Sequence, residues 1–302
     1  MTAPTSSTFT AFGLDAEAEP IAAGLHVVAT PIGNLADISL RALATLAAAH
    51  VVVAEDTRVT KTLLAHYGIT TPLVAYHEHN AAEMRPRLLG RLAAGEALAL
   101  VSDAGTPLVS DPGFRLVGEA LAQGHAVTAI PGASAVLAAL VVAGLPTSRF
   151  FFEGFLPVKS AARRQRIAEI AAVPATLVFF ESPRRLGELL ADLAAVLGPR
   201  EAAVARELTK LYEAVRRGPL PELAAAYAVE DAPRGEIVVI VGPPTKGAPI
   251  LDGDALDARL REALRTLSIK DAASVVSGET GQPRRKVYAR AVELAAASAP
   301  PR

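Results

Sequence analysis

The segment ALVSDAGTPLVSDPG, residues 99–113, ends an apolar run in a dense series of turn-forming residues. Its first residues belong to the apolar run 97–101, which is typical of a buried β-strand. Gly105 and the prolines after it interrupt regular backbone, because glycine admits positive φ and proline fixes φ. A strand that stops in such a loop, with the carboxylates of Asp103 and Asp111, forms either a tight strand-to-helix turn or one wall of a ligand site.

The same alternation of apolar run and polar loop recurs through the first half of the chain. Strands are expected over residues 25–29, 51–54, 73–76, 97–101 and 126–130, and helices over residues 39–48, 60–66, 81–94 and 113–123. This spacing predicts a mainly parallel sheet that is covered by helices on both faces. Ligands bind beyond the carboxyl ends of such strands, so the loops after these strands favour one shared site.

A second α/β region and a helical tail are expected to follow. The predicted strands of that region are 150–152, 175–180, 202–205 and 236–241, its helices are 161–172 and 185–197, and the tail helices are 255–267, 271–278 and 283–297, with Asp271 as an N-cap and Pro283 in a first turn. The chain is thus divided into a mobile tail (1–23), two α/β domains (24–134 and 135–243), a Pro/Gly-rich linker (244–254) and a helical unit (255–298).

Composition excludes several classes of protein and site. The chain has 302 residues, no cysteine and a formal net charge of -1, so a disulfide framework, a thiolate nucleophile and a cysteine zinc site are excluded. No apolar run approaches the roughly 18 residues of a membrane span, and the first 24 residues carry no Lys or Arg. P-loop, G-x-G-x-x-G, G-x-S-x-G and H-E-x-x-H motifs are absent. A cytoplasmic protein is expected.

Three polar loops carry chemistry, and each has a simpler structural explanation. In AEDTR (54–58), two carboxylates and an arginine either start a helix or contact a substrate. In HEHN (77–80), the histidines favour hydrogen bonding over metal ligation, because further ligands are lacking nearby. In ESPRR (181–185), the arginines suit phosphate. The segment 204–218 is expected as a solvated helix face or a further phosphate contact.

The tail is locally basic in a chain that is otherwise balanced. Between residues 259 and 290 there are eight basic and three acidic side chains. Three short helices with PRRKVYAR (283–290) at the start of the last one resemble a helix-turn-helix unit, which suggests RNA or DNA contact. The alternative is a capping bundle with a basic face.

Eight motifs in order give the chain a specific resemblance. They are ATPIGNLADISLRAL, AEDTR, HEHN, LVSDAGTPLVSDPG, IPGASA, FFEGFLP, FFESPRRL and RELTKLYE. Together they resemble the 16S ribosomal RNA ribose 2′-O-methyltransferase I family of the tetrapyrrole-methylase-like class, over residues 24–296. The resemblance implies two α/β domains with S-adenosylmethionine bound between them, a homodimer, and methylation of a cytidine 2′-hydroxyl near the decoding site of the small ribosomal subunit, with no DNA partner.

The resemblance also implies roles for individual residues. Those implied to bind the cofactor are Ile32, Ala104, Gly105, Thr106, Val109, Ser134, Ala135, Phe180 and Glu181. The chemistry of the reaction, apart from the resemblance, makes Glu55, Asp56, His79, Asp103 and Glu181 candidate bases for the hydroxyl, with pure positioning as the alternative, and no metal is required. Candidate RNA contacts are Arg58, Arg184, Arg185, Arg284, Arg285 and Lys286. A small-molecule tetrapyrrole methylase and a non-catalytic ribosome-assembly factor remain the alternative functions.

Overall fold

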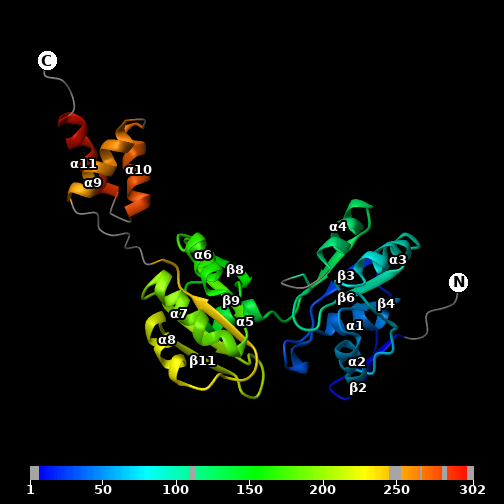
Figure 1. Cartoon of the computed structure of the whole chain (residues 1–302). Coiled ribbons are helices and arrows are strands. Elements are labelled where there is room, and N and C mark those ends of the chain that lie inside the picture. The colour runs from blue at the N-terminus through cyan, green and yellow to red at the C-terminus, as the bar shows by residue number, and fades with distance from the viewer. Residues whose placement is uncertain (1–6, 109–112, 245–252, 266, 281–283, 298–302) are drawn as a thin grey trace.

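The computed structural model describes residues 7–108, 113–244, 253–265, 267–280 and 284–297. Two α/β domains follow one another along the chain, and three helices form a separate unit at its C-terminal end (Figure 1). Among the residues that the structure describes, no helix is both long enough and apolar enough to cross a membrane.

The first domain contains a five-stranded sheet in which every strand runs parallel, as predicted. In spatial order its strands are β5 (Leu73–Ala75), β4 (Val51–Ala54), β6 (Ala97–Val101), β3 (Gly24–Val28) and β7 (Val127–Ile130). Because β6, β3 and β7 are neighbours, the loops that follow them meet at one place on the sheet edge. The loop after β5 leaves from the far side.

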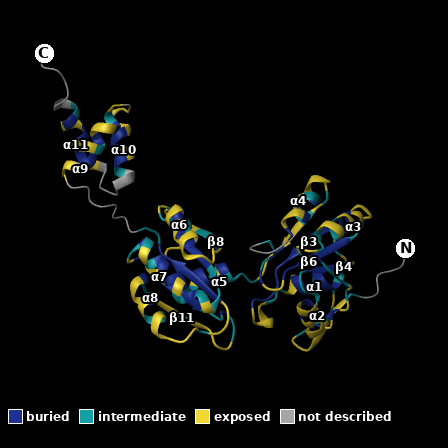
Figure 2. Ribbon diagram, in the orientation of Figure 1, coloured by how far each residue is buried: buried dark blue, intermediate teal, exposed yellow. Residues whose placement is uncertain are grey.

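Helices cover both faces of this sheet. One face carries α1 (Leu40–Ala48) and α2 (Thr57–His66), after a short 3-10 turn η1 (Leu35–Asp37), and the other carries α3 (Ala81–Ala93) and α4 (Phe114–Ala122). Ser39 begins α1 by accepting a hydrogen bond from the amide of Ala42 at 3.1 Å. Every residue of β3, β4 and β6 is buried, as a doubly covered sheet requires (Figure 2).

The expectation of a mobile tail over residues 1–23 is wrong for its described part, residues 7–23. The chain there forms an antiparallel hairpin of β1 (Thr8–Ala11) and β2 (Leu14–Glu17). Phe9 is buried in the cluster beneath α1 and α2, and the amide of Thr10 donates to the carbonyl of Tyr67 at 2.8 Å. A single buried aromatic side chain thus fixes a segment whose composition is typical of a loose terminus.

The second domain has a mixed sheet that is mostly antiparallel. In spatial order its strands are β11 (Ala214–Pro219), β10 (Glu201–Arg206), β12 (Ile237–Val241), β9 (Thr176–Glu181) and β8 (Phe150–Phe155). Only β8 and β9 pair in parallel. The start of β12 therefore lies beside the end of β9, with Ile237 opposite Glu181.

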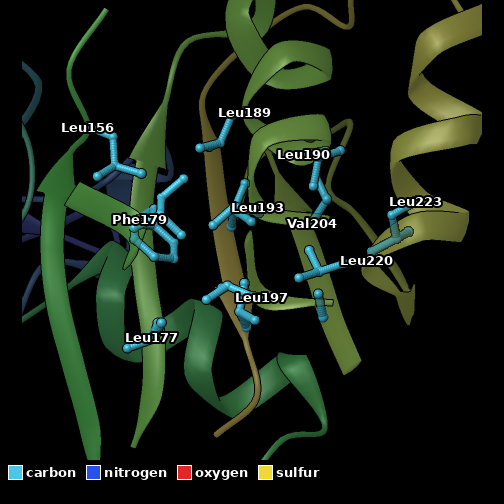
Figure 3. Packing of buried hydrophobic residues seen from close by; sticks show 14 of the residues in the cluster. Leu156, Leu177, Phe179, Leu189, Leu190, Leu193, Leu197, Val204, Leu220 and Leu223 are labelled. Atoms are coloured by element: carbon cyan, nitrogen blue, oxygen red, sulfur yellow. The ribbon is translucent and has the colours of Figure 1, made fainter. Parts of the chain in front are cut away.

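The helices of this domain also occupy both faces of their sheet. One face carries α6 (Ser160–Ile170), α7 (Leu186–Leu197), which follows the 3-10 turn η2 (Pro183–Arg185), and α8 (Leu220–Val229). Leucines of α7 and α8 pack on Leu177, Phe179 and Val204 of the strands (Figure 3), and α6 adds Ile167 and Ile170 to the same cluster. The other face carries α5 (Ala135–Ala143), and Ile32 of the first domain joins its apolar cluster. An apolar contact therefore links the two domains.

Two further expectations about local structure are wrong, one in each α/β domain. Residues 204–218 form the end of β10, a turn and β11 rather than a helix. Glu207 and Thr209 have φ of +51° and +67°, values that end any helix. In the first domain, α2 begins at Thr57 instead of residue 60, because the Asp56 carboxylate accepts the amide of Arg58 at 2.8 Å and caps the helix earlier.

The C-terminal unit consists of α9 (Gly253–Leu264), α10 (Ile269–Thr280) and α11 (Arg284–Ala297). Its helices surround a core of their own that includes Leu260, Val276 and Val287. The N-cap of α10 is Ser268, whose hydroxyl oxygen accepts the amide of Asp271 at 3.2 Å, so the expectation of Asp271 as the cap is wrong by three residues. The predicted first-turn proline, at position 283, lies outside the described residues.

Candidate active site

A cavity of about 430 Å³ opens between the two α/β domains. The first domain lines it with the loops after β3 and β6, and the second domain lines it with the start of α5 and the edge formed by β9 and β12. The lining residues are Ile32, Ala104, Gly105, Thr106, Ser134, Ala135, Val136, Phe155, Phe180, Glu181, Ser182, Pro183, Gly235, Glu236, Ile237 and Val238. We call this cavity the interdomain cleft.

Backbone hydrogen bonds fix the first-domain wall of the cleft. Thr30 and Gly105 exchange two of them, at 2.9 and 3.1 Å, so the loops after β3 and β6 hold each other. The Thr106 hydroxyl ties the second loop to the carbonyl of Ala133 at 3.2 Å. Gly105 has φ of +80°, and a Cβ there would lie 3.2 Å from Ile32 Cγ2. The glycine therefore keeps this wall open to the close approach of a ligand.

Side chains form most of the second-domain wall. The ring of Phe180 packs edge-on against Phe152 and Phe155, with centroid distances of 4.9 and 5.7 Å. Phe155 is 60% exposed, so it presents an aromatic surface at the rim of the cleft. This wall offers apolar area to a flat or aliphatic ligand.

Glu181 brings a carboxylate into the same wall, although its side chain is fully buried. Oε1 accepts the amide of Ser182 at 2.7 Å. Oε2 lies 3.1 Å from the Arg185 guanidinium but accepts no hydrogen bond within the described part of the chain. The charged partner of this oxygen within the wall is therefore the Arg185 guanidinium.

A cluster of three charged residues closes the second-domain edge against the first domain, and we call it the Lys210 clasp. The Lys210 ammonium donates to Glu207 Oε1 at 2.8 Å and to Glu236 Oε2 at 3.1 Å. Its aliphatic stem covers Gly33, where a Cβ would fall 2.4 Å from Lys210 Cε. The Glu207 carboxylate in turn covers Gly235. Two glycines thus make room for the clasp.

The clasp shifts the pKa of its own members. Hydrogen bonds from Lys210 and from the amide of Glu236 hold the pKa of Glu207 below its ordinary value. Burial lowers the pKa of Lys210, but the hydrogen bonds to Glu207 and Glu236 outweigh this effect and raise it overall. Both groups are therefore charged near neutral pH.

A second cavity of about 400 Å³ adjoins the cleft, and we call it the side cavity. It is lined by Thr30, Pro31, Ile32, Gly33, Leu35, Val59, Thr60, Thr62, Leu63, Ser102, Asp103, Ala104, Lys210 and Glu236. Ile32, Ala104 and Glu236 line both cavities. The two spaces therefore share one wall.

Comparison with known proteins shows what this architecture is similar to. Residues 24–224 match the tetrapyrrole (corrin/porphyrin) methylase family, and residues 251–295 match the RsmI C-terminal HTH domain. A protein from Mesorhizobium japonicum named ribosomal RNA small subunit methyltransferase I is 52% identical over 92% of this chain and 94% of its own length. A protein of the same name from Pseudomonas aeruginosa is 48% identical over 89% of this chain and 96% of its own length.

The chain belongs to the ribosomal RNA small subunit methyltransferase I family. Solved structures confirm the predicted fold class. Diphthine synthase superposes with a TM-score of 0.56 at 20% identity, over 72% of this chain and 89% of its own. Uroporphyrin-III C-methyltransferase from Thermus thermophilus, complexed with S-adenosylhomocysteine, superposes with a TM-score of 0.50 at 24% identity, over 72% of this chain and 97% of its own.

Within this family member, the cleft collects nearly all of the residues that were expected to bind the cofactor. Eight of them line it together: Ile32, Ala104, Gly105, Thr106, Ser134, Ala135, Phe180 and Glu181. Val109 lies outside the described residues. Binding of the cofactor by these eight residues stays a prediction, which their common cavity supports.

Unlike the residues expected to bind the cofactor, the candidate bases do not line one common cavity. Asp103 lines the side cavity and Glu181 lines the cleft, whereas Glu55, Asp56 and His79 line neither cavity. Asp56 forms an ion pair with Arg58 at 2.6 Å, and this hydrogen-bonded partner lowers the pKa of Asp56 to about 2. His79 follows the edge strand β5, in a loop that Asn80 closes by accepting the amide of His77 at 2.8 Å. The sheet order therefore keeps His79 away from the cleft.

The candidate RNA contacts also differ in how far they are exposed. Arg58, Arg184, Arg285 and Lys286 are exposed. Arg185 turns inward, where its guanidinium donates to the carbonyl of Leu156 at 2.9 Å. It therefore connects the end of β8 to the carboxylate of Glu181. The side chain of Arg284 lies outside the described residues.

Sequence reasoning missed the residues at the start of β12. Gly235 and Glu236 line the cleft, but the rule applied to the sequence looks only beyond the carboxyl ends of strands. Lys210 lies in the motif RELTKLYE, yet its contact with Gly33 depends on how the two domains meet. The described residues contain no group of three or more His, Cys, Asp or Glu side chains that could hold a metal ion.

Proposed function

We propose that this protein transfers a methyl group from S-adenosylmethionine to the ribose 2′-hydroxyl of a cytidine in small-subunit ribosomal RNA. The main support for this proposal is that eight residues expected to bind the cofactor line a single cavity. The chain is also 52% identical to a protein named ribosomal RNA small subunit methyltransferase I. The basic helical unit gives the chain a second means to hold RNA.

The cleft fits the proposed cofactor in size and in chemistry. Its volume of about 430 Å³ falls within the roughly 300–1,000 Å³ of small-molecule sites. The start of α5 at Ser134 and Ala135 faces the cavity, and amides at a helix N-terminus favour a carboxylate such as that of the methionine portion. Phe180 offers an apolar surface, and Glu181 adds a buried carboxylate to the same wall.

Alignment is the main task that this chemistry leaves to the protein. The cofactor supplies a methyl group that is already activated on a sulfonium. The chain must hold the acceptor oxygen in line with the bond that breaks, and the rigid wall around Gly105 provides a fixed reference for that alignment.

The hydroxyl loses its proton as the methyl group arrives, and we assign Glu236 as the acceptor of that proton. Its carboxylate is the only one, among the described residues, that lines both cavities. Its carboxylate pairs at 3.1 Å with the Lys210 ammonium, and Lys210 also lines the side cavity. Glu55, Asp56 and His79 lie elsewhere, so the base is sought at the shared wall.

The proposal includes a homodimer in the cytoplasm, where ribosomal subunits are found. Support for the dimer comes from large apolar side chains that are left exposed on the second domain. Val141 of α5 is 80% exposed, and Leu211 and Tyr212 are 88% and 69% exposed. Apolar area of this kind is often covered by a second copy. Light scattering of the purified protein tests this part.

The first experiment measures transfer of labelled methyl from S-adenosylmethionine to small ribosomal subunits and to free 16S RNA from cells that lack the protein. We expect label in a 2′-O-methylcytidine. At saturating cofactor, Glu236→Gln should lose about a hundredfold in the rate of transfer, within the range for a general base. Binding of the cofactor without transfer to either RNA would contradict the proposal and point to a tetrapyrrole acceptor or a non-catalytic assembly role.

A further inference from the structure

The side cavity adjoins the proposed cofactor site along one boundary. It shares Ile32, Ala104 and Glu236 with the interdomain cleft, so these three residues lie at the boundary between the two spaces. An acceptor oxygen has to come within about 3–3.5 Å of the carbon it attacks. A nucleoside in the side cavity would lie against the boundary that also lines the proposed cofactor site.

We propose that the side cavity binds the target nucleoside and that Asp103 selects cytosine over uracil through the exocyclic amino group. This inference rests on the proposed function, because it takes a cytidine in RNA as the acceptor. It assigns Asp103 a role in specificity rather than in proton transfer.

The charges of the cavity favour a nucleobase over a phosphate. The charged residues in its lining are Asp103, Glu236 and Lys210. The Lys210 ammonium is already shared by Glu207 and Glu236 at 2.8 and 3.1 Å. The lining thus holds two carboxylates and one ammonium, and the exposed Arg58, which interacts electrostatically with Asp103, lies outside it, so the lining itself suits a hydrogen-bond donor better than a phosphate. Cytosine presents such a donor in its amino group, whereas uracil presents a carbonyl oxygen at the same position.

Asp103 is the carboxylate with capacity for that donor. Its Oδ1 accepts the amide of Asp56 at 2.9 Å, which fixes the side chain at the end of β6. Oδ2 accepts no hydrogen bond from the residues that the structure describes. Glu236, by contrast, already has one oxygen on Lys210. A fixed carboxylate with one unused oxygen is well suited to read an amino group.

The remaining walls suit the flat face of a base. Leu35 and Val59 are 39% and 45% exposed, and they face the cavity from η1 and α2. The stem of Lys210 lies over Gly33 on the opposite side. The cavity volume of about 400 Å³ is in the range of small-molecule sites. A nucleotide that enters here leaves the base stack, at a cost that is smallest in single-stranded RNA.

The test compares two small-subunit substrates that carry cytidine or uridine at the methylated position, mapped beforehand with the wild-type enzyme. Wild type should prefer cytidine by about tenfold to a hundredfold, the range of one good base contact. Asp103→Asn should lose at least tenfold of that preference, because an amide N–H can bond the carbonyl of uracil. Equal loss of transfer to both substrates would overturn the assignment, since a general base would give that result.

A second variant tests the cavity itself. Thr62 is exposed on α2 and lines the side cavity, so Thr62→Trp should fill it and reduce transfer to RNA at least tenfold with cofactor affinity unchanged. Ala65→Trp adds the same ring to an exposed position of α2 that lines neither cavity, and it should transfer normally. Normal transfer by Thr62→Trp would overturn the proposal. Absence of transfer by the wild-type protein would instead refute the proposed function.

Discussion

The first α/β domain reaches the cleft through the carboxyl ends of parallel strands, whereas the second reaches it through both ends of antiparallel strands. The first wall consists largely of backbone around Ala104 and Gly105, held by paired hydrogen bonds to Thr30. The second wall consists of side chains, with Phe180 and Glu181 at its centre and the Lys210 clasp at its edge.

This difference determines how each wall responds to substitution. A wall built from backbone fails when volume is added, because the ligand and the neighbouring loop have no room to move. A wall built from charged side chains fails when a partner is lost or when pH changes its charge. The variants below separate the two responses.

The largest effect is expected at Gly105. Valine there meets a φ of +80° and places its Cβ 3.2 Å from Ile32 Cγ2, inside the lining of the cleft. We expect affinity for S-adenosylmethionine to fall at least about a hundredfold, since backbone strain of about 1–2 kcal/mol adds to steric overlap with the ligand. Isothermal titration measures the change. Gly118→Val in α4, where nothing lies within 4 Å of the added Cβ, should bind normally.

A substitution at Gly235 tests the second-domain wall at the point where the Glu207 carboxylate of the clasp lies. Its φ is +95°, and a Cβ there would lie 2.2 Å from Glu207 Cδ, so Gly235→Ala displaces the carboxylate that holds Lys210. We expect about a tenfold loss of cofactor affinity. Gly198→Ala has a comparable φ of +69° with nothing within 4 Å of its Cβ, so it carries the backbone strain without the displacement. Equal affinities of the two variants for S-adenosylmethionine would show that the clasp does not contribute to cofactor binding.

The same difference between the walls explains what the sequence predicted. In a parallel sheet every ligand-facing loop follows a strand, so the loops after β3, β6 and β7 were predictable from apolar runs that end in turn residues. In the antiparallel second sheet, Glu236 precedes its strand, and it reaches the cleft because Ile237 pairs with Glu181. That pairing joins residues 56 positions apart in the chain, and no local pattern encodes it.

Strand order sets a second limit on prediction. His79 follows a strand as Asp103 does, and both were candidates on equal terms. In the structure β5 is an edge strand and β6 is central, so only Asp103 reaches a cavity. The buried hairpin around Phe9 and the strand β11 were missed for a related reason, since packing against distant partners overrides weak local signals.

The charged wall should respond to pH where the backbone wall does not. The folded pKa of Glu207 is lowered from 4.5, so its contribution to stability is present above that value and is lost as pH falls through the folded pKa. The pKa of Lys210 is raised from 10.5, so its contribution is present below that value and is lost only in strong base. The clasp should therefore hold between about pH 5 and pH 10.

The variant Glu207→Gln tests the direction of this dependence of stability on pH. The melting temperature of the wild-type protein should fall between pH 5 and pH 3, and the variant should begin lower at pH 7 and fall less over the same interval. Glu78→Gln removes an exposed carboxylate of the first domain and should leave the acid slope as in wild type. Parallel acid slopes for Glu207→Gln and wild type would show that the clasp does not titrate in this range.

The smallest effect is expected far from both walls, on α11, where Arg285 and Lys286 are exposed on a unit with its own core. If they contact RNA phosphates, replacing both with alanine should lower RNA affinity several-fold. The slope of log affinity against log salt concentration should fall by about 1.4 on single-stranded RNA, at about 0.7 per contact. Cofactor affinity should not change. Arg87→Ala, on an exposed helix of the first domain, should keep the wild-type slope. An unchanged slope in the double variant would make the helical unit a structural cap, and RNA would then have to be held at the cleft.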